Sequence, residues 1–406
     1  MTVYRAAWVC PMTCAPIASG WFSISDGRIE AVGAPGQPPP SSPVRDLGAV
    51  AVLPGLVNAH THLELSYLRG RVPPASSFMG WIKQLFLSRG GRRENPEDPE
   101  VVDAATEAAR EARSFGTAAV GDIGNSLASP RPIAEAGLRG IVFHELIGFN
   151  HRDGSIVETT RPERERAGIT APDRVRVSIG PHAPYSVSPE LFRAIRAEAD
   201  RMDSAITSVH LAESAAELDL LRDGSGPWPG LLTLIGAMPP GWTPPRLDPV
   251  AYLESLGMLD GRTLVVHGVQ LTDEELRRLA SIGCTLVTCP RSNQWVGAGV
   301  PPIERFYASG VRVAVGSDSL ASVEDLNLFA ELKTMRWLAP SLPARHILES
   351  ATLIGATALG FGDAIGSIEP GKLAELVAVD VPDGEIDVEE YLLSGIEGRR
   401  IHWVPV

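Results

Sequence analysis

The pattern of apolar and polar positions changes twice along the chain. Near the start, residues 21–33 alternate as two short strands around an Asp-Gly turn. A connector rich in proline and serine at residues 35–43 then leads to an apolar run at residues 49–53. The last part, residues 366–406, returns to strand-and-turn character. We therefore expect the two terminal segments to join into one small β-sandwich.

Between these ends, short apolar runs alternate with stretches of helical periodicity, such as residues 101–113, 190–199 and 273–280. The apolar runs have the length of strands and lie at residues 117–120, 140–143, 175–179, 206–209, 263–266, 285–287 and 311–315. Together with the strand that leads to His60, these runs make eight predicted strands. Repeated βα units of this kind predict an α/β fold, a parallel (β/α)₈ TIM barrel.

This pattern divides the chain into three predicted segments. Residues 1–54 and 361–406 are the two parts of the β-sandwich, and residues 55–360 are the catalytic barrel. Residues 224–249, rich in glycine, proline and tryptophan, follow the fifth barrel strand. Because barrel active sites lie at the carboxyl ends of the strands, we expect this segment to be a lid or a pocket wall.

Composition and charge narrow the choice of partners. The 406 residues are 44% hydrophobic and 21% charged, which is typical of a globular protein with a large core. The net charge of −13 argues against nucleic acid or an anionic membrane as a partner, although charge inside a site can oppose the overall sign. No apolar stretch has the length of a membrane span and no secretory signal is recognisable, so we expect a cytoplasmic protein. The four cysteines form neither a disulfide framework nor a paired zinc clasp.

Histidines gather where the predicted strands end. His60 and His62 leave the first barrel strand, and alternate strand positions point the same way. Later strands end at His182, His210, His267 and Asp318. A lone histidine at a strand end is usually structural. Five histidines and one aspartate at the same end of successive strands instead indicate a functional site, since functional groups of a barrel gather on that face.

Three imidazoles and one carboxylate suit Zn²⁺ or Fe²⁺. We expect His60, His62 and His210 to be ligands, with Asp318 as the fourth ligand or as the group that accepts a proton from water. Glu213, three residues after His210, is the candidate general acid and base. The alternative is that Glu213 opens the next helix, where a carboxylate is favoured by the helix dipole.

The chain resembles the amidohydrolase superfamily along nearly its whole length, in the runs PGLVNAHTHLELS, HLAES, VVHG, GSDSLAS and GSIEPGKLAELVAVD. It is similar to the branch that contains adenosine, cytosine, guanine and methylthioadenosine/S-adenosylhomocysteine deaminases and the triazine hydrolases. That branch uses one metal ion, and here no lysine ends the fourth strand, where His182 stands. The resemblance implies one Zn²⁺ per subunit, with Fe²⁺ or Mn²⁺ as alternatives.

Finer resemblance is to deaminases of 6-aminopurine nucleosides. It is carried by GPHAPYSVSPELF around His182 and by CPRSN at residues 289–293, which correspond to substrate-gripping segments in those enzymes. The HTHLELS run with Phe78 and Trp81 downstream, together with GSDSLAS, is most similar to aminodeoxyfutalosine deaminases of menaquinone synthesis. The resemblance implies release of ammonia from such a nucleoside. Its alternatives are deamination of methylthioadenosine, S-adenosylhomocysteine, guanine or cytosine, or hydrolysis of a triazine.

The family mechanism implies a role for each candidate. The metal, with His267 and Asp318, activates a water that attacks C6 of the adenine ring. Glu213 protonates N1 and then passes a proton to the leaving ammonia. The family also implies a small-molecule substrate, and many of its members form dimers or larger homo-oligomers.

Substrate contacts are expected from Glu64, Phe78, Trp81, Glu145, His182 and Ser319. Alternatives remain for several of them. Glu64 and Glu145 are equally compatible with a supporting role around the site or with the start of a helix. Phe78 and Trp81 share one helical face, so they either stack on the base or pack in the core.

Overall fold

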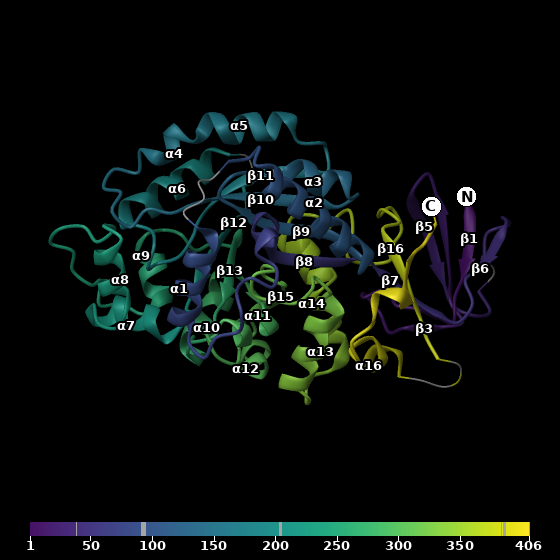
Figure 1. Ribbon diagram of the computed structural model, residues 1–406. Helices are drawn as coiled ribbons and strands as arrows, with labels where there is room; N and C mark the ends of the chain where they lie inside the picture. The colour runs from purple at the N-terminus through teal and green to yellow at the C-terminus, as the bar shows by residue number, and fades with distance from the viewer. Residues whose placement is uncertain (38, 91–94, 203–204, 383, 385–386, 406) are drawn as a thin grey trace.

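The computed structural model describes residues 1–37, 39–90, 95–202, 205–382, 384 and 387–405. Figure 1 shows a helix-covered barrel beside a smaller set of strands that carries both chain termini. The division into residues 1–54, 55–360 and 361–406 remains a prediction, whereas the architecture of each part is directly visible.

Eight parallel strands form the barrel. They are β8 (Leu56–Thr61), β9 (Thr117–Gly124), β10 (Arg139–Leu146), β11 (Val175–Pro181), β12 (Thr207–Leu211), β13 (Thr263–His267), β14 (Thr285–Thr288) and β15 (Arg312–Val315). They make two sheets in the orders β11-β10-β9-β8 and β12-β13-β14-β15. Backbone hydrogen bonds join the sheets at both edges, from Asp318 N to His60 O (3.0 Å) and from His210 N to His182 O (2.9 Å). The predicted barrel is confirmed.

Helices cover the outside of the barrel, and the longer ones bury an apolar face against it. In α6 (Pro189–Arg201), Leu191, Phe192 and Ile195 are fully buried, and the Ser188 side chain caps the helix by accepting from Leu191 N (3.1 Å). The predicted helices at residues 101–113 and 273–280 are α2 (Pro99–Ser114) and α10 (Asp273–Ile282). In the described part of the chain, no helix is both long and apolar enough to cross a membrane.

The remaining helices follow the barrel strands along the chain, except the last two, which lie in the C-terminal segment. They are η1 (Leu63–Leu68), α1 (Phe78–Arg89), α3 (Pro130–Glu135), α4 (Ile156–Thr159), α5 (Arg161–Thr170), α7 (Ala215–Asp223), α8 (Trp228–Leu234), α9 (Pro249–Ser255), α11 (Pro290–Trp295), α12 (Ile303–Ala308), α13 (Leu328–Leu338), α14 (Ala344–Ser350), α15 (Leu353–Ala358), α16 (Val388–Leu392) and η2 (Gly398–Arg400).

The strands at the two ends of the chain form the β-sandwich. One sheet contains β5 (Arg28–Gly33), β4 (Trp21–Ser25), β1 (Thr2–Arg5) and β6 (Val44–Asp46), in that order. The other contains β17 (Ile401–Trp403), β16 (Leu376–Asp380), β7 (Val50–Pro54), β2 (Trp8–Val9) and β3 (Ile17–Ala18). Antiparallel pairing of β7 with β16 places Leu376 opposite Pro54, so the N- and C-terminal segments share one sheet as expected.

Candidate active site

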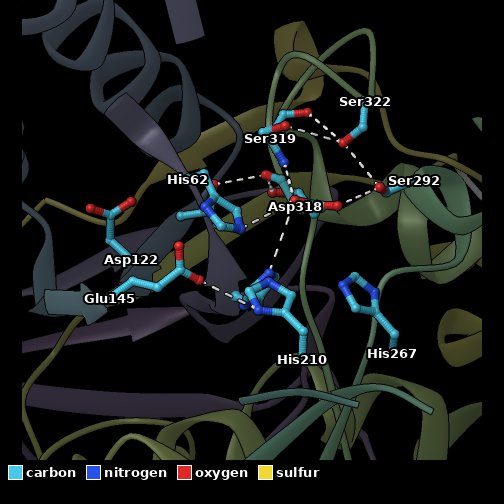
Figure 2. Close-up of polar contacts among 12 residues, drawn as sticks. His62, Asp122, Glu145, His210, His267, Ser292, Asp318, Ser319 and Ser322 are labelled. Atoms are coloured by element: carbon cyan, nitrogen blue, oxygen red, sulfur yellow. Dashed lines mark hydrogen bonds and ion pairs between the residues drawn. The ribbon is translucent and has the colours of Figure 1, made fainter. Parts of the chain in front are cut away.

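The carboxyl ends of the barrel strands bring four histidine rings together. The ring centroid of His60, on β8, lies 4.9 Å from that of His62, 4.9 Å from that of His210 and 5.6 Å from that of His267. Figure 2 shows His62, His210 and His267 around Asp318. Strand alternation explains the pairing of His60 with His62, and barrel closure brings in the other two.

The residues of this cluster fit a divalent metal ion. His60 is fully buried, and neither of its ring nitrogens has a hydrogen-bond partner among the described residues. Burial lowers the pKa of His60 well below its usual value and that of His62 to about 3, so both imidazoles are neutral, as metal ligands must be. Ligand atoms of His60, His62 and Asp318 lie within 4.8 Å of one another, as do those of His60, His210 and His267. A buried imidazole without a partner is costly unless a ligand satisfies it.

Asp318 is held in place by several hydrogen bonds. Its Oδ2 accepts from the Ser292 hydroxyl (2.5 Å) and its Oδ1 from Ser319 N (2.8 Å). Its Oδ1 also lies 3.6 Å from His62 Nε2 (Figure 2). The residue has a φ of 61°, in the left-handed region that aspartate tolerates better than most residues. Burial raises the pKa of Asp318, although the bond from Ser292 opposes this.

His267 connects the histidine cluster to the candidate acid. Its Nδ1 lies 3.0 Å from Asn293 Nδ2, and its Nε2 lies 3.7 Å from Glu213 Oε1. With the Asn293 amide donating to Nδ1, the imidazole carries its proton on Nε2, which faces Glu213. The CPRSN segment therefore positions two residues of the site through hydrogen bonds: Asn293 orients His267, and Ser292 orients Asp318.

Glu213 follows β12 and lines the cleft at the mouth of the barrel. Burial raises its pKa well above the usual range, and the charges of Asp318 and Glu217 add to this effect. The turn before it is strained, with Ala212 at φ 51°, and Glu217 Oε1 accepts from Ala212 N (2.9 Å). Since α7 begins only at Ala215, Glu213 stands ahead of the helix with its carboxyl group in the cleft.

The two other candidate glutamates lie differently. Glu145 lines the cleft, and its Oε1 is 3.5 Å from His210 Nδ1 (Figure 2). Burial raises the pKa of Glu145 to about 7. Glu64 is outside the cleft lining, because its Oε1 accepts from Asn125 N (2.6 Å) and its Oε2 from Ser126 N (3.0 Å). Asn125 in turn donates from Nδ2 to Glu145 Oε2 (3.0 Å). Glu64 therefore acts on the site indirectly, by holding Asn125 in place.

Asn125 also lines the cleft and was absent from the sequence-based candidates. A polar residue directly after Gly124, the last residue of β9, was the signal that could have identified it.

An aromatic cluster forms the outer wall of the cleft. Phe78 and Trp81, on α1, line it together with Tyr185, and the Phe78 centroid lies 6.4 Å from that of Trp81. Tyr185 stacks on Trp228 with centroids 4.0 Å apart. Trp228 is the first residue of α8, inside the segment 224–249. This segment therefore packs against the cleft wall through the stacking of Trp228 on Tyr185. His182 and Ser319 also line the cleft.

A parallel barrel with a histidine cluster and buried carboxylates at the carboxyl ends of its strands is the architecture of a metal-dependent barrel hydrolase. The chain belongs to the amidohydrolase family, whose sequence model matches residues 51–398. It is thus an enzyme that hydrolyses carbon–nitrogen bonds.

Three known proteins illustrate the similarity. A 5-methylthioadenosine/S-adenosylhomocysteine deaminase of Moorella thermoacetica is 30% identical over 98% of this chain and 91% of its own length. An aminodeoxyfutalosine deaminase of Deinococcus radiodurans is 32% identical over 77% of this chain and 74% of its own. The crystal structure of a zinc-bound adenosine deaminase from Xanthomonas campestris superposes with a TM-score of 0.81 at 28% identity, covering 98% of this chain and 90% of that one.

Proposed function

We propose that this enzyme is a hydrolytic deaminase of a 6-aminopurine nucleoside, with aminodeoxyfutalosine as the leading candidate substrate. The observation that carries the proposal is the pair of buried carboxyl groups, Glu213 and Asp318, in one cleft with four imidazoles whose pKa values are lowered by burial. These imidazoles are His62, His182, His210 and His267. The similarity to deaminases of adenine-containing nucleosides supports the choice of bond and ring.

His60, His62, His210 and Asp318 are the residues that would hold the metal. Zn²⁺ suits this set, and Fe²⁺ or Mn²⁺ are the alternatives. When bound, such an ion supplies Lewis acidity that lowers the pKa of water toward neutrality.

The protein's own groups then move the protons. Asp318 accepts a proton from the attacking water, which His267 orients through its Nε2–H, and the water oxygen bonds to C6. Glu213, protonated because of its raised pKa, donates to N1. The resulting carboxylate takes the remaining proton of the new hydroxyl group and delivers it to the amino nitrogen. The C6–N bond breaks, ammonia leaves, and the ring becomes a 6-oxopurine.

A second candidate substrate is methylthioadenosine or S-adenosylhomocysteine. The support is the Moorella relative, which matches 98% of this chain. Aminodeoxyfutalosine, methylthioadenosine and S-adenosylhomocysteine share the reacting ring and differ only in the 5′ substituent.

The test is ammonia release by zinc-loaded protein from aminodeoxyfutalosine, methylthioadenosine, S-adenosylhomocysteine, adenosine, guanine and cytosine. We expect turnover of 6-aminopurine nucleosides, with aminodeoxyfutalosine giving the highest kcat/KM. Ammonia from guanine or cytosine alone would contradict the proposed ring. If metal is bound but no compound of the panel releases ammonia, the result would instead favour hydrolysis without deamination, as in the triazine hydrolases.

A further inference from the structure

The cleft contains a positive charge that the deamination chemistry does not use. Arg89, the last residue of α1, lines the same cleft as Glu213 and Asp318. Among the described residues that line it, Arg89 is the only arginine or lysine. Within the described chain its guanidinium group also forms no ion pair or hydrogen bond. A guanidinium group in such a place has donors available for a ligand.

The charge of Arg89 reaches the reacting end of the cleft. Burial lowers the pKa of His182 and His62, and the charge of Arg89 lowers both further. The same charge opposes the burial that raises the pKa of Glu145. A cation in the last turn of a helix is favoured by the helix dipole, but a position facing solvent would satisfy the dipole equally well. The dipole therefore does not explain why Arg89 lines the cleft.

The wall around Arg89 is apolar. It includes Ile82 and Leu85 from the same helix, and Ile147 after β10. Trp81 lies in this wall too, and its buried indole Nε1 has no hydrogen-bond partner among the described residues. The wall thus offers an apolar surface and one cation, whereas the Nε1 of Trp81 is buried within it. This combination matches a ligand that is apolar along its length and anionic at its end.

We propose that Arg89 binds a carboxylate at the end of an apolar 5′ substituent of the nucleoside. The inference rests on the proposed deaminase function, because that function places the purine against Glu213 and Asp318 and leaves the 5′ substituent for the wall of α1. A guanidinium group pairs with a carboxylate through two parallel hydrogen bonds, which gives direction as well as affinity. With a net charge of −13 the protein as a whole repels anions, so an anionic substrate needs a local cation.

The inference is tested with two synthetic nucleosides that differ only in the carboxylate. These are 5′-S-(3-carboxyphenyl)-5′-thioadenosine and 5′-S-phenyl-5′-thioadenosine. For the zinc-loaded enzyme we expect kcat/KM to be about 10-fold to 100-fold higher for the first, the range of one charge-assisted contact. Arg89→Met, which keeps the length of the side chain and removes its charge, should bring the ratio of the two kcat/KM values close to one. Lys83→Met removes an exposed charge from the same helix and should keep the wild-type ratio.

The outcomes separate this inference from the proposed function. If the wild-type enzyme and Arg89→Met deaminate the two nucleosides with the same ratio, Arg89 does not read the carboxylate, and the deaminase assignment stands. An equal loss of the ratio in Lys83→Met would also overturn the inference, because it would show a general effect of charge. If the wild-type enzyme deaminates neither these nucleosides nor any in the panel above, the proposed function fails and the inference falls with it.

Discussion

Glu213 and Asp318 are two carboxyl groups with raised pKa values in one buried site. Burial is the main cause for both, and the charge of Asp318 further raises the pKa of Glu213. The hydrogen bond from Ser292 favours the ionised form of Asp318. Where the environments of two such groups push their pKa values apart, the group with the higher pKa acts as the acid and the other as the base. Here they favour Glu213 as the proton donor and Asp318 as the acceptor.

At the residue scale we expect Glu213→Gln to lower kcat by about 10²-fold to 10⁴-fold, the usual contribution of general acid–base catalysis. The amide keeps the shape of the side chain but cannot carry the proton. Because Glu213 is not a proposed ligand, the metal content measured by atomic absorption should remain that of the wild type. Glu274→Gln, at an exposed position of α10, is the control. Unchanged turnover in Glu213→Gln would place the acid elsewhere.

The contact between β8 and the end of β15 sets the spacing between His60 and Asp318. Gly316 lies against His60 so closely that a Cβ at this position would be 2.6 Å from His60 O and 2.7 Å from His60 Cβ. Neither neighbour is the flexible end of a side chain. A larger residue must therefore push β8 and its two histidines away from Asp318.

At the element scale we expect Gly316→Ala to destabilise the protein by about 1–3 kcal/mol, as overpacking typically does. It should also reduce metal content, since it moves two proposed ligands. Urea unfolding and metal analysis measure the two effects. Gly168→Ala in α5, where a Cβ meets nothing within 4 Å, should be neutral or stabilising by up to ~1 kcal/mol. Equal stability of the two variants would show that the contact between β8 and β15 yields easily.

The proposed ligands come from both halves of the barrel. His60 lies on β8 and His62 directly follows it, in one four-stranded sheet. His210 lies on β12 and Asp318 follows β15, in the other. A bound ion would therefore link the two sheets in addition to the backbone hydrogen bonds at their edges. Binding to the folded state alone stabilises it by mass action.

At the scale of the whole molecule we expect chelation of the metal to lower Tm. Zn²⁺ held at 100 times its Kd should add about 2.7 kcal/mol to the free energy of unfolding. Differential scanning calorimetry with and without the chelator measures the change, and His210→Ala should respond much less to zinc. The metal assignment would be contradicted if wild-type protein gave the same Tm in excess Zn²⁺ and in excess chelator.

Much of the fold follows from local patterns in the sequence. Apolar runs and helical periodicity predicted the eight strands, because strand and helix periods differ and each βα unit repeats the same pattern. The strand-end positions of His60, His62, His210 and Asp318 indicated a common site, and the structure places them together. Their roles as ligands stay predictions. The ends of the strands were less predictable than their existence. The apolar run at residues 117–120 continues to Gly124 as β9, because hydrogen bonding to β8 and β10 extends the strand.

The sequence by itself thus determined the barrel, the β-sandwich and the set of histidines, because each depends on short-range periodicity and on the rule that parallel strands end on one face. Only the tertiary structure decided how the site is supported and what else enters the cleft. Asn125 is held by Glu64 from 61 positions away, and Arg89 lines the cleft because α1 forms part of its wall. The raised pKa of Glu213 likewise depends on burial among distant segments. Contacts and burial of this kind arise only after the chain has folded, so no local pattern encodes them.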